Sequence, residues 1–196
     1  MGKYGAFSDF YFSSLLLMIF SPLPSTPLIT QGFGQNPADY AIFDLVGRNG
    51  IEFGIPMGTA VYAPHDGVAT VKDEGIKNYG LSITIDDGKR RSLLAHLSHA
   101  NVQTGQQISQ GDAVGLSGKS GNATGPHLHW TFFLVMNGQI QHTDNGFQRA
   151  MDVTECTRLW LAQDLHHDAQ YAQSAQGYLS LSLPANQYIK NMAVHA

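Results

Sequence analysis

Short runs of alternating apolar and polar residues, separated by glycine-containing turns, occupy the middle of the chain. Residues 81–85 (Leu-Ser-Ile-Thr-Ile) alternate as a half-buried strand does. Asp87-Gly88 and Asn137-Gly138 have the composition of tight hairpin turns. Further strands are expected at residues 28–34, 60–63, 67–72, 91–97, 127–135 and 139–141. The pattern predicts an all-β fold, a small antiparallel sandwich or barrel.

Composition agrees with a turn-rich β protein. Only 13% of the 196 residues are charged, and 21 are glycine. The net charge of −4 offers no basic footprint, so nucleic acid is not an expected partner. The single cysteine, Cys156, excludes a disulfide within the chain.

Three segments are expected along the chain. Residues 1–27 form a leader or signal segment, with an apolar run at residues 10–20 and a proline-rich linker. Residues 28–153 form the main domain, in which residues 35–47 are expected to be a loop. Residues 154–196 form a partly helical C-terminal extension of unknown role.

The pair His127 and His129 begins the expected strand at residues 127–135. Residues two apart in a strand point to the same face, about 7 Å apart. One imidazole could therefore bind a metal while the other handles protons. An isolated His-x-His pair in a strand more often has no chemical role. A role in metal binding or proton transfer therefore requires other functional side chains close to the pair. The candidates are His96, Glu52 and the glycine-rich segment 115–121.

Four ordered blocks carry a family resemblance. They are G-x-E-F-x-x-P-x-G-T-x-V from Gly50, A-H-L around His96, V-x-x-G-x-x-I-x-x-G-x-x-V-G-x-S-G-x-S-G from Val102, and G-P-H-L-H-W from Gly125. From about residue 30 to 140, the chain resembles the lysostaphin and LytM-like zinc endopeptidases. These enzymes cleave bacterial peptidoglycan and have a small antiparallel β-fold, the duplicated hybrid motif.

The resemblance implies a role for each matching residue. His129 falls on one zinc-ligand position, Glu52 on a second that is usually aspartate, and Arg48 on a third that is usually histidine. His96 and His127 fall on the catalytic positions, which assist proton transfer from zinc-bound water. The segment containing Gly118, Ser120 and Gly121 would border the substrate groove.

Arg48 conflicts with the zinc that the resemblance implies. A guanidinium group has donors only and stays protonated, so it cannot bind a metal. At about 4 Å and an effective dielectric of about 20, it would repel a divalent ion by roughly 8 kcal/mol. One hypothesis is that Arg48 and Glu52 form an ion pair in place of zinc. The other is that Arg48 turns to solvent and leaves a weak site of Glu52, His129 and His127.

The remaining histidines match no ligand position. His65 is expected in a turn and His99 in a loop, where either could substitute for a missing ligand only by rearrangement. Four others lie outside the blocks and are expected on the surface: His142, His166, His167 and His195.

Residues 113–120 nearly match a phosphate-binding loop, with alanine in the first glycine position. That mechanism needs a helix that begins at Lys119-Ser120. Gly121, Gly125 and Pro126 follow too closely for such a helix, so no nucleotide is expected.

Two functions of different classes fit these residues. One is a zinc metallo-endopeptidase that cleaves the cross-links or stems of bacterial peptidoglycan, as His96, His127 and His129 favour. The other is a non-catalytic relative that binds peptidoglycan or regulates a hydrolase, as Arg48 favours. Either would work in the extracellular space or cell envelope, or in a phage that degrades the wall.

Overall fold

The computed structural model of the protein describes residues 19–25, 27–140, 145–153 and 157–158. In this part of the chain, strands dominate and two helical turns are present. The strands are β1 (Ile19–Phe20), β2 (Leu28–Gln31), β3 (Ile51–Gly54), β4 (Ala60–Tyr62), β5 (Gly67–Asp73), β6 (Leu81–Asp86), β7 (Arg90–Ala100), β8 (Gln107–Ile108), β9 (Ala113–Ser117), β10 (Leu128–Met136), β11 (Gln139–Ile140) and β12 (Thr157–Arg158). The helical turns are α1 (Pro37–Tyr40) and η1 (Ala41–Phe43).

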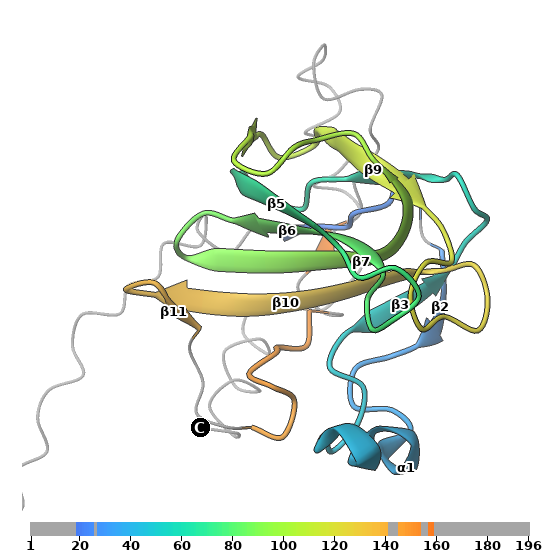
Figure 1. Ribbon diagram of the computed structural model, residues 1–196. Coiled ribbons are helices and arrows are strands. Elements are labelled where there is room, and N and C mark those ends of the chain that lie inside the picture. Colours follow the sequence, from blue (N-terminus) through green and yellow to red (C-terminus); the bar gives the residue numbers. More distant parts are fainter. Residues whose placement is uncertain (1–18, 26, 141–144, 154–156, 159–196) are drawn as a thin grey trace, which may run out of the picture. The chain divides into compact units, whose positions relative to one another are not determined.

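The main sheet has the strand order β2-β3-β10-β7-β6-β5-β8, with β11 on β10 and with β9 joining β7 to β4 (Figure 1). Every pairing in this sheet is antiparallel, and β1 and β12 form a separate parallel pair. The all-β antiparallel fold class predicted from the sequence is therefore confirmed.

The longest strand, β7, serves two parts of the sheet. Its first half pairs with β10 and β6, and its second half pairs with β9. Between the halves, the register to β6 shifts, since Leu81 opposes Leu97 while Ile83 opposes Leu94. The extra residue is a β-bulge, which bends a strand and redirects its side chains.

The expected hairpins are present at both places. Asp87-Gly88 joins β6 to β7, and Asn137-Gly138 joins β10 to β11. Asn137 and Gly138 both have positive φ, 53° and 73°, as a tight hairpin turn requires.

Three local expectations are wrong. Residues 37–43, expected as loop, form α1 and η1, because Pro37 supplies the fixed φ that begins a helix. Residues 19–23, expected as leader and linker, pack into the domain, since Ile19 and Leu23 are both buried in its core. His99, expected in a loop, lies in β7.

Apolar side chains from both parts of the sheet form one core, which the alternation of each strand directs inward. Trp130 and Phe132 of β10 are its largest members, and Ile83, Leu94 and Leu97 pack around them. The core fixes β10, and with it the histidine pair at the start of that strand.

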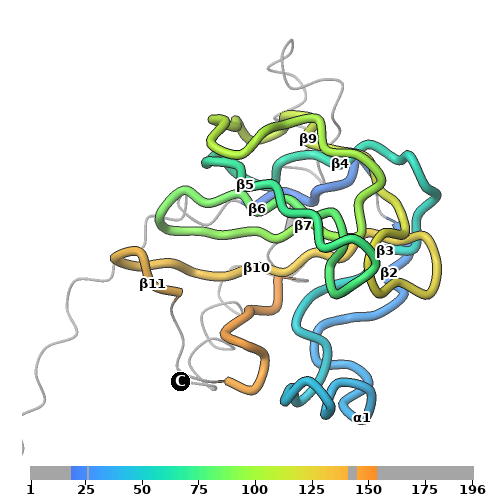
Figure 2. The backbone as a smooth tube through the Cα atoms, in the orientation of Figure 1, coloured from blue at the N-terminus to red at the C-terminus, as the bar shows by residue number. Residues whose placement is uncertain are grey.

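Two loops lie side by side at one end of the sheet (Figure 2). The β5–β6 loop and the β9–β10 loop are joined where the Gly121 N–H donates to the Gly75 carbonyl, 3.1 Å away. Gly80 and Gly121 both have positive φ, and a Cβ on either would lie about 2.4 Å or less from backbone of the other loop. This close approach requires glycine at both positions.

Among the described residues, no helix is long and apolar enough to cross a membrane. The C-terminal extension, Cys156 and the four histidines His142, His166, His167 and His195 lie outside the described residues.

Candidate functional site

The register of β3 and β10 brings Glu52 and His129 together. The two residues are direct partners in the antiparallel ladder, and His129 also opposes Ala95 of β7. Directly opposed side chains in such a ladder lie about 5 Å apart at Cβ. Gly50 is needed beside them, because a Cβ there would come within 2.5 Å of the His129 ring.

Arg48 points into this site and pairs with Glu52. The guanidinium Nη2 forms an ion pair with Glu52 Oε1 and also lies 2.6 Å from His129 Nδ1. The Arg48 side chain is only 12% exposed, so the hypothesis that it turns to solvent is wrong. The ion pair expected from the sequence is present.

Tyr40 of α1 holds the other side of the guanidinium. Arg48 Nη1 donates to Tyr40 Oη at 3.0 Å, and Tyr40 donates in turn to Gln31 Oε1 at 2.8 Å. Burial raises the pKa of Tyr40, so its hydroxyl stays protonated and can make both bonds. The backbone of Arg48 is also fixed, since its N–H donates to the Gln35 carbonyl and its carbonyl accepts from Gly34.

The contacts of His129 define its tautomer. Because a guanidinium only donates, Nδ1 must be an acceptor, and the proton then lies on Nε2 and is donated to Thr131 Oγ1 at 2.6 Å. Burial and the nearby Arg48 charge hold the pKa of His129 well below its usual value. The ring is therefore neutral, and its lone pair is directed at Arg48.

These residues do not fit a zinc ion. The atoms of Glu52 and His129 that would coordinate it both face the Arg48 guanidinium, and Arg48 itself has no lone pair to offer. In the part of the chain that the structure describes, no group of three or more His, Cys, Asp or Glu side chains is arranged to hold a metal.

His96 and His127 form a second pair next to this cluster. Their ring centroids are 4.5 Å apart, and His96 lies 6.0 Å from His129. Each Nδ1 donates to a backbone carbonyl, His96 to Ser120 at 2.8 Å and His127 to Gly125 at 2.9 Å. The Nε2 atom of His127 is buried, has no hydrogen-bond partner among the described residues, and lies 3.6 Å from Glu52 Oε1.

His96 occupies the bulge of β7 in a left-handed conformation, with φ of 62°. Such a conformation is uncommon for histidine and often occurs at functional sites. Burial lowers the pKa of His96 to about 4, so the ring is neutral near pH 7.

The predicted groove residues lie beside the histidines. Gly118 forms a bridge with His127, and a Cβ on Gly118 would meet the Ser98 amide at 2.5 Å. Ser120 accepts from His96 through its carbonyl and from the Leu81 N–H through its hydroxyl. Gly121 makes the loop contact described above. That these three residues contact substrate stays a prediction.

Three residues of the site were not predicted from the sequence: Thr131, Tyr79 and Tyr40. Thr131 follows His129 by two positions, so strand alternation could have placed it on the same face. Tyr79 stacks on His129 at 5.4 Å between ring centroids, and Tyr40 holds Arg48. Tyr40 comes from α1 and Tyr79 from the β5–β6 loop, and no local pattern marks either residue.

The two described histidines outside the blocks have other roles. His65 is fully buried, with Nδ1 bonded to the Asp66 carbonyl and Nε2 to the Ser92 hydroxyl. His99 is exposed on β7. Neither lies in the cluster, so neither substitutes for the ligand position that Arg48 occupies.

Comparison with known proteins now decides the family. Residues 46–142 match the model of Peptidase family M23, and these residues include every member of the site except Gln31 and Tyr40. The chain belongs to this family. The M23 fold class and its lysostaphin-like architecture agree with the sheet described above.

Three known proteins illustrate the similarity. The chain is 39% identical over 93 residues to the peptidoglycan DD-endopeptidase ShyA of Vibrio cholerae, covering 47% of this chain and 21% of that protein. It is 35% identical over 106 residues to the glycyl-glycine endopeptidase ALE-1 of Staphylococcus capitis, covering 51% and 28%. A zinc-containing peptidase from V. cholerae has the same fold, with a TM-score of 0.53, 27% identity, and coverage of 68% and 39%.

The chain covers 21% of the length of the ShyA protein and 28% of that of ALE-1, so it matches less than a third of either relative. The M23 domain is the shared part. The names of these proteins mention zinc and peptidoglycan, whereas in this chain the Arg48 guanidinium lies between Glu52 and His129.

Proposed function

We propose that this M23 domain binds the peptide part of bacterial peptidoglycan without hydrolysing it through zinc. The proposal rests on one observation, the Arg48 guanidinium bonded to both Glu52 and His129. The relatives' names supply the substrate class, which is peptidoglycan. On this proposal the protein acts in the extracellular space or the cell envelope, or as part of a phage.

Glu52 and Arg48 neutralise each other, so the floor of the site carries hydrogen-bonding groups with little net charge. Peptide groups are neutral and polar, and such a floor suits them.

A second candidate is residual hydrolysis. It is favoured by the arrangement of His96 and His127. Their rings pack closely on each other, and each Nδ1 atom is bonded to a backbone carbonyl. On that alternative Arg48 would have to leave the site when metal and substrate bind.

One experiment separates the two candidates. Purified protein is mixed with insoluble bacterial sacculi, with and without a chelator, and both the bound protein and the released peptides are measured. The proposal predicts retention on sacculi, no released peptide, and no effect of chelator. Release that chelator abolishes would establish hydrolysis instead, and absence of retention would refute the binding function.

The double variant Arg48→His with Glu52→Asp tests the cause. It replaces the guanidinium by a ligand and shortens the carboxylate arm, so hydrolysis is expected to appear only in this variant. Arg91→His, at an ion pair remote from the site, is the matched control and should leave the protein inactive.

A further inference from the structure

Residues 145–151, which we call the strap, join the sheet to the segment that precedes β3. The strap lies below β10 in Figure 1, in orange. At one end, the Met151 N–H donates to the Phe132 carbonyl of β10 at 2.9 Å. At the other end, the Gly146 carbonyl accepts from the Val46 N–H, also at 2.9 Å. Both ends of the strap are therefore fixed to the domain.

The middle of the strap has an uncommon backbone conformation. Gln148 and Arg149 both have positive φ, 53° and 68°. Positive φ is uncommon for residues other than glycine, and such strain often occurs at functional sites. Asn145 stabilises the conformation, since its Oδ1 accepts from the Arg149 N–H at 3.0 Å and its Nδ2 donates to the Ala150 carbonyl at 2.9 Å.

From this backbone, the exposed residue Gln148 reaches the buried residue Asn49, which is 4% exposed. Asn49 Nδ2 donates to Gln148 Oε1 and to Tyr79 Oη, each at 3.4 Å. An amide nitrogen has two hydrogens. Gln148 accepts one of them, and the other is then directed at the Tyr79 hydroxyl.

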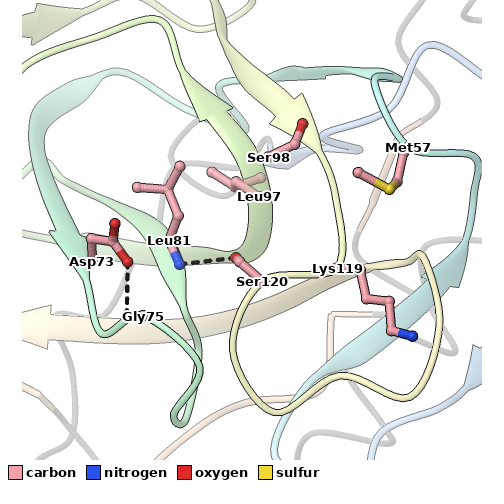
Figure 3. Close-up of a pocket in the computed structure, with 8 residues that line it drawn as sticks. All are labelled: Met57, Asp73, Gly75, Leu81, Leu97, Ser98, Lys119 and Ser120. Atoms are coloured by element: carbon pink, nitrogen blue, oxygen red, sulfur yellow. Dashed lines mark hydrogen bonds between the residues drawn. The ribbon is translucent and has the colours of Figure 1, made fainter.

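The backbone around Tyr79 is fixed independently of Asn49. The Tyr79 carbonyl accepts from the His96 N–H at 3.0 Å. In the same loop, the Leu81 N–H donates to the Ser120 hydroxyl at 2.9 Å (Figure 3). The bond from Asn49 therefore acts on the direction of the Tyr79 side chain, not on the course of the loop.

The Tyr79 ring covers the ring of His129. The two centroids are 5.4 Å apart and the planes differ by 19°, so the rings are stacked. His129 is fully buried, and its Nδ1 faces the Arg48 guanidinium. Water that reached this contact would compete for both groups and weaken their bond.

We propose that the strap positions the Tyr79 ring so that water does not reach the contact between Arg48 and His129. It acts through the two hydrogen bonds of Asn49, so Gln148 and Asn49 are positioning residues. The inference rests on the proposed function for its purpose, since that function depends on the same contact.

The test measures by NMR how fast the His129 Nε2 proton exchanges with water. Gln148→Met removes the acceptor at an exposed position and keeps the length of the side chain, so exchange should become about tenfold faster. Gln148→Glu keeps an acceptor for Asn49 and should retain the natural rate. Arg149→Met, with the same left-handed backbone and an exposed side chain, is the control and should also retain it. A natural rate in Gln148→Met, or equal acceleration in Gln148→Glu, would overturn the inference.

The chemical shifts of the His129 ring protons show whether Gln148 acts through Tyr79. Tyr79→Phe keeps the ring and loses only the hydroxyl that bonds to Asn49. Gln148→Met and Tyr79→Phe should therefore shift these signals in the same direction, because both release the stacked ring. In protein that already carries Tyr79→Phe, Gln148→Met should cause no further shift. Shifts that add in the double variant would also overturn the inference.

Retention on sacculi separates this inference from the proposed function. If the natural protein is not retained but its exchange rate depends on Gln148, the binding function is refuted and the positioning role stands. If the protein is retained and Gln148→Met leaves the exchange rate unchanged, the positioning role alone is refuted.

Discussion

His127 directly precedes β10 and His129 lies two residues later, within that strand, yet the two rings have different chemical environments. The lone pair of His129 is directed at the Arg48 guanidinium, in a cluster that satisfies its own charges. His127 packs on His96, and its buried Nε2 atom lies 3.6 Å from Glu52 Oε1 without a hydrogen-bond partner among the described residues. Around His129 a guanidinium holds both the carboxylate and the imidazole, whereas around His127 two histidine rings pack on each other. Two histidines two residues apart therefore lie in different electrostatic environments, and the difference comes from the charged side chain of Arg48 beside His129.

The largest effect is expected when metal-binding side chains replace Arg48 and Glu52, which would remove the difference between the two histidine environments. The variant Arg48→His with Glu52→Asp should bind zinc at least 1,000-fold more tightly than the natural protein, a difference of about 4 kcal/mol. At a zinc concentration of 100 times its dissociation constant, the variant should gain about 2.7 kcal/mol of stability. Thermal unfolding with and without zinc measures this gain. A similar gain in the unmodified protein would contradict the role assigned to Arg48.

The second effect concerns the contact between the β5–β6 and β9–β10 loops, which lie beside His96. Gly121→Ala should cost about 3 kcal/mol, because φ is +72° and a Cβ would lie 2.4 Å from the Gly80 amide. Gly125→Ala is the matched control, since a Cβ there meets no atom within 4 Å. Urea unfolding compares the two variants. Equal stability would mean that the two loops are not locked together beside His96.

The third effect measures the ion pair itself. A double-mutant cycle with Arg48→Met and Glu52→Gln should give a coupling energy of about 2 kcal/mol, because both side chains are largely buried, at 12% and 17% exposed. The pair Arg91–Asp86, at 32% and 28% exposed, should give under about 1 kcal/mol. Equal coupling energies in the two cycles would show that the Arg48–Glu52 pair is no stronger than an exposed ion pair.

The smallest effect is a pH dependence of stability. Burial lowers the pKa of His96 to about 4, so below its unfolded value of 6.5 the unfolded state binds more protons than the folded state. Stability should therefore fall as pH decreases from 6.5 toward 4, by about 1 kcal/mol between pH 7 and pH 5.5 from this residue. Burial lowers the pKa of His65 too, which adds in the same direction.

His96→Asn should reduce this slope, since asparagine tolerates the left-handed backbone and does not titrate. His99→Gln, at an exposed position on the same strand, should leave the slope as in the natural protein. A slope that is unchanged by His96→Asn would contradict the buried, neutral state of His96.

The strands and the motif positions could be predicted from the sequence because both depend on residues that are close together along the chain. Alternation predicted β6, the run of strand-forming residues after His129 predicted β10, and two-residue turns predicted the hairpins at Asp87-Gly88 and Asn137-Gly138. The resemblance put Arg48 and Glu52 on two ligand positions of one site, and this predicted their ion pair.

The remaining features depend on contacts between distant segments. The bulge that places His96 arises from the register of β7 against β6, which no local pattern records. Tyr40 holds Arg48 from a helical turn that appeared to be loop in the sequence, and Tyr79 stacks on His129 from the β5–β6 loop. Ile19 and Leu23 belong to the core, although Ile19 was expected in the leader and the prolines around Leu23 suggested a linker.

The most direct test of the account is a calorimetric titration of the unmodified, chelator-treated protein with zinc at neutral pH. Because Arg48 is bonded to the atoms of Glu52 and His129 that a metal would need, we predict no binding tighter than about 100 μM, or roughly −5.5 kcal/mol. One-to-one binding with a submicromolar dissociation constant, lost in His129→Ala, would contradict the replacement of zinc by Arg48.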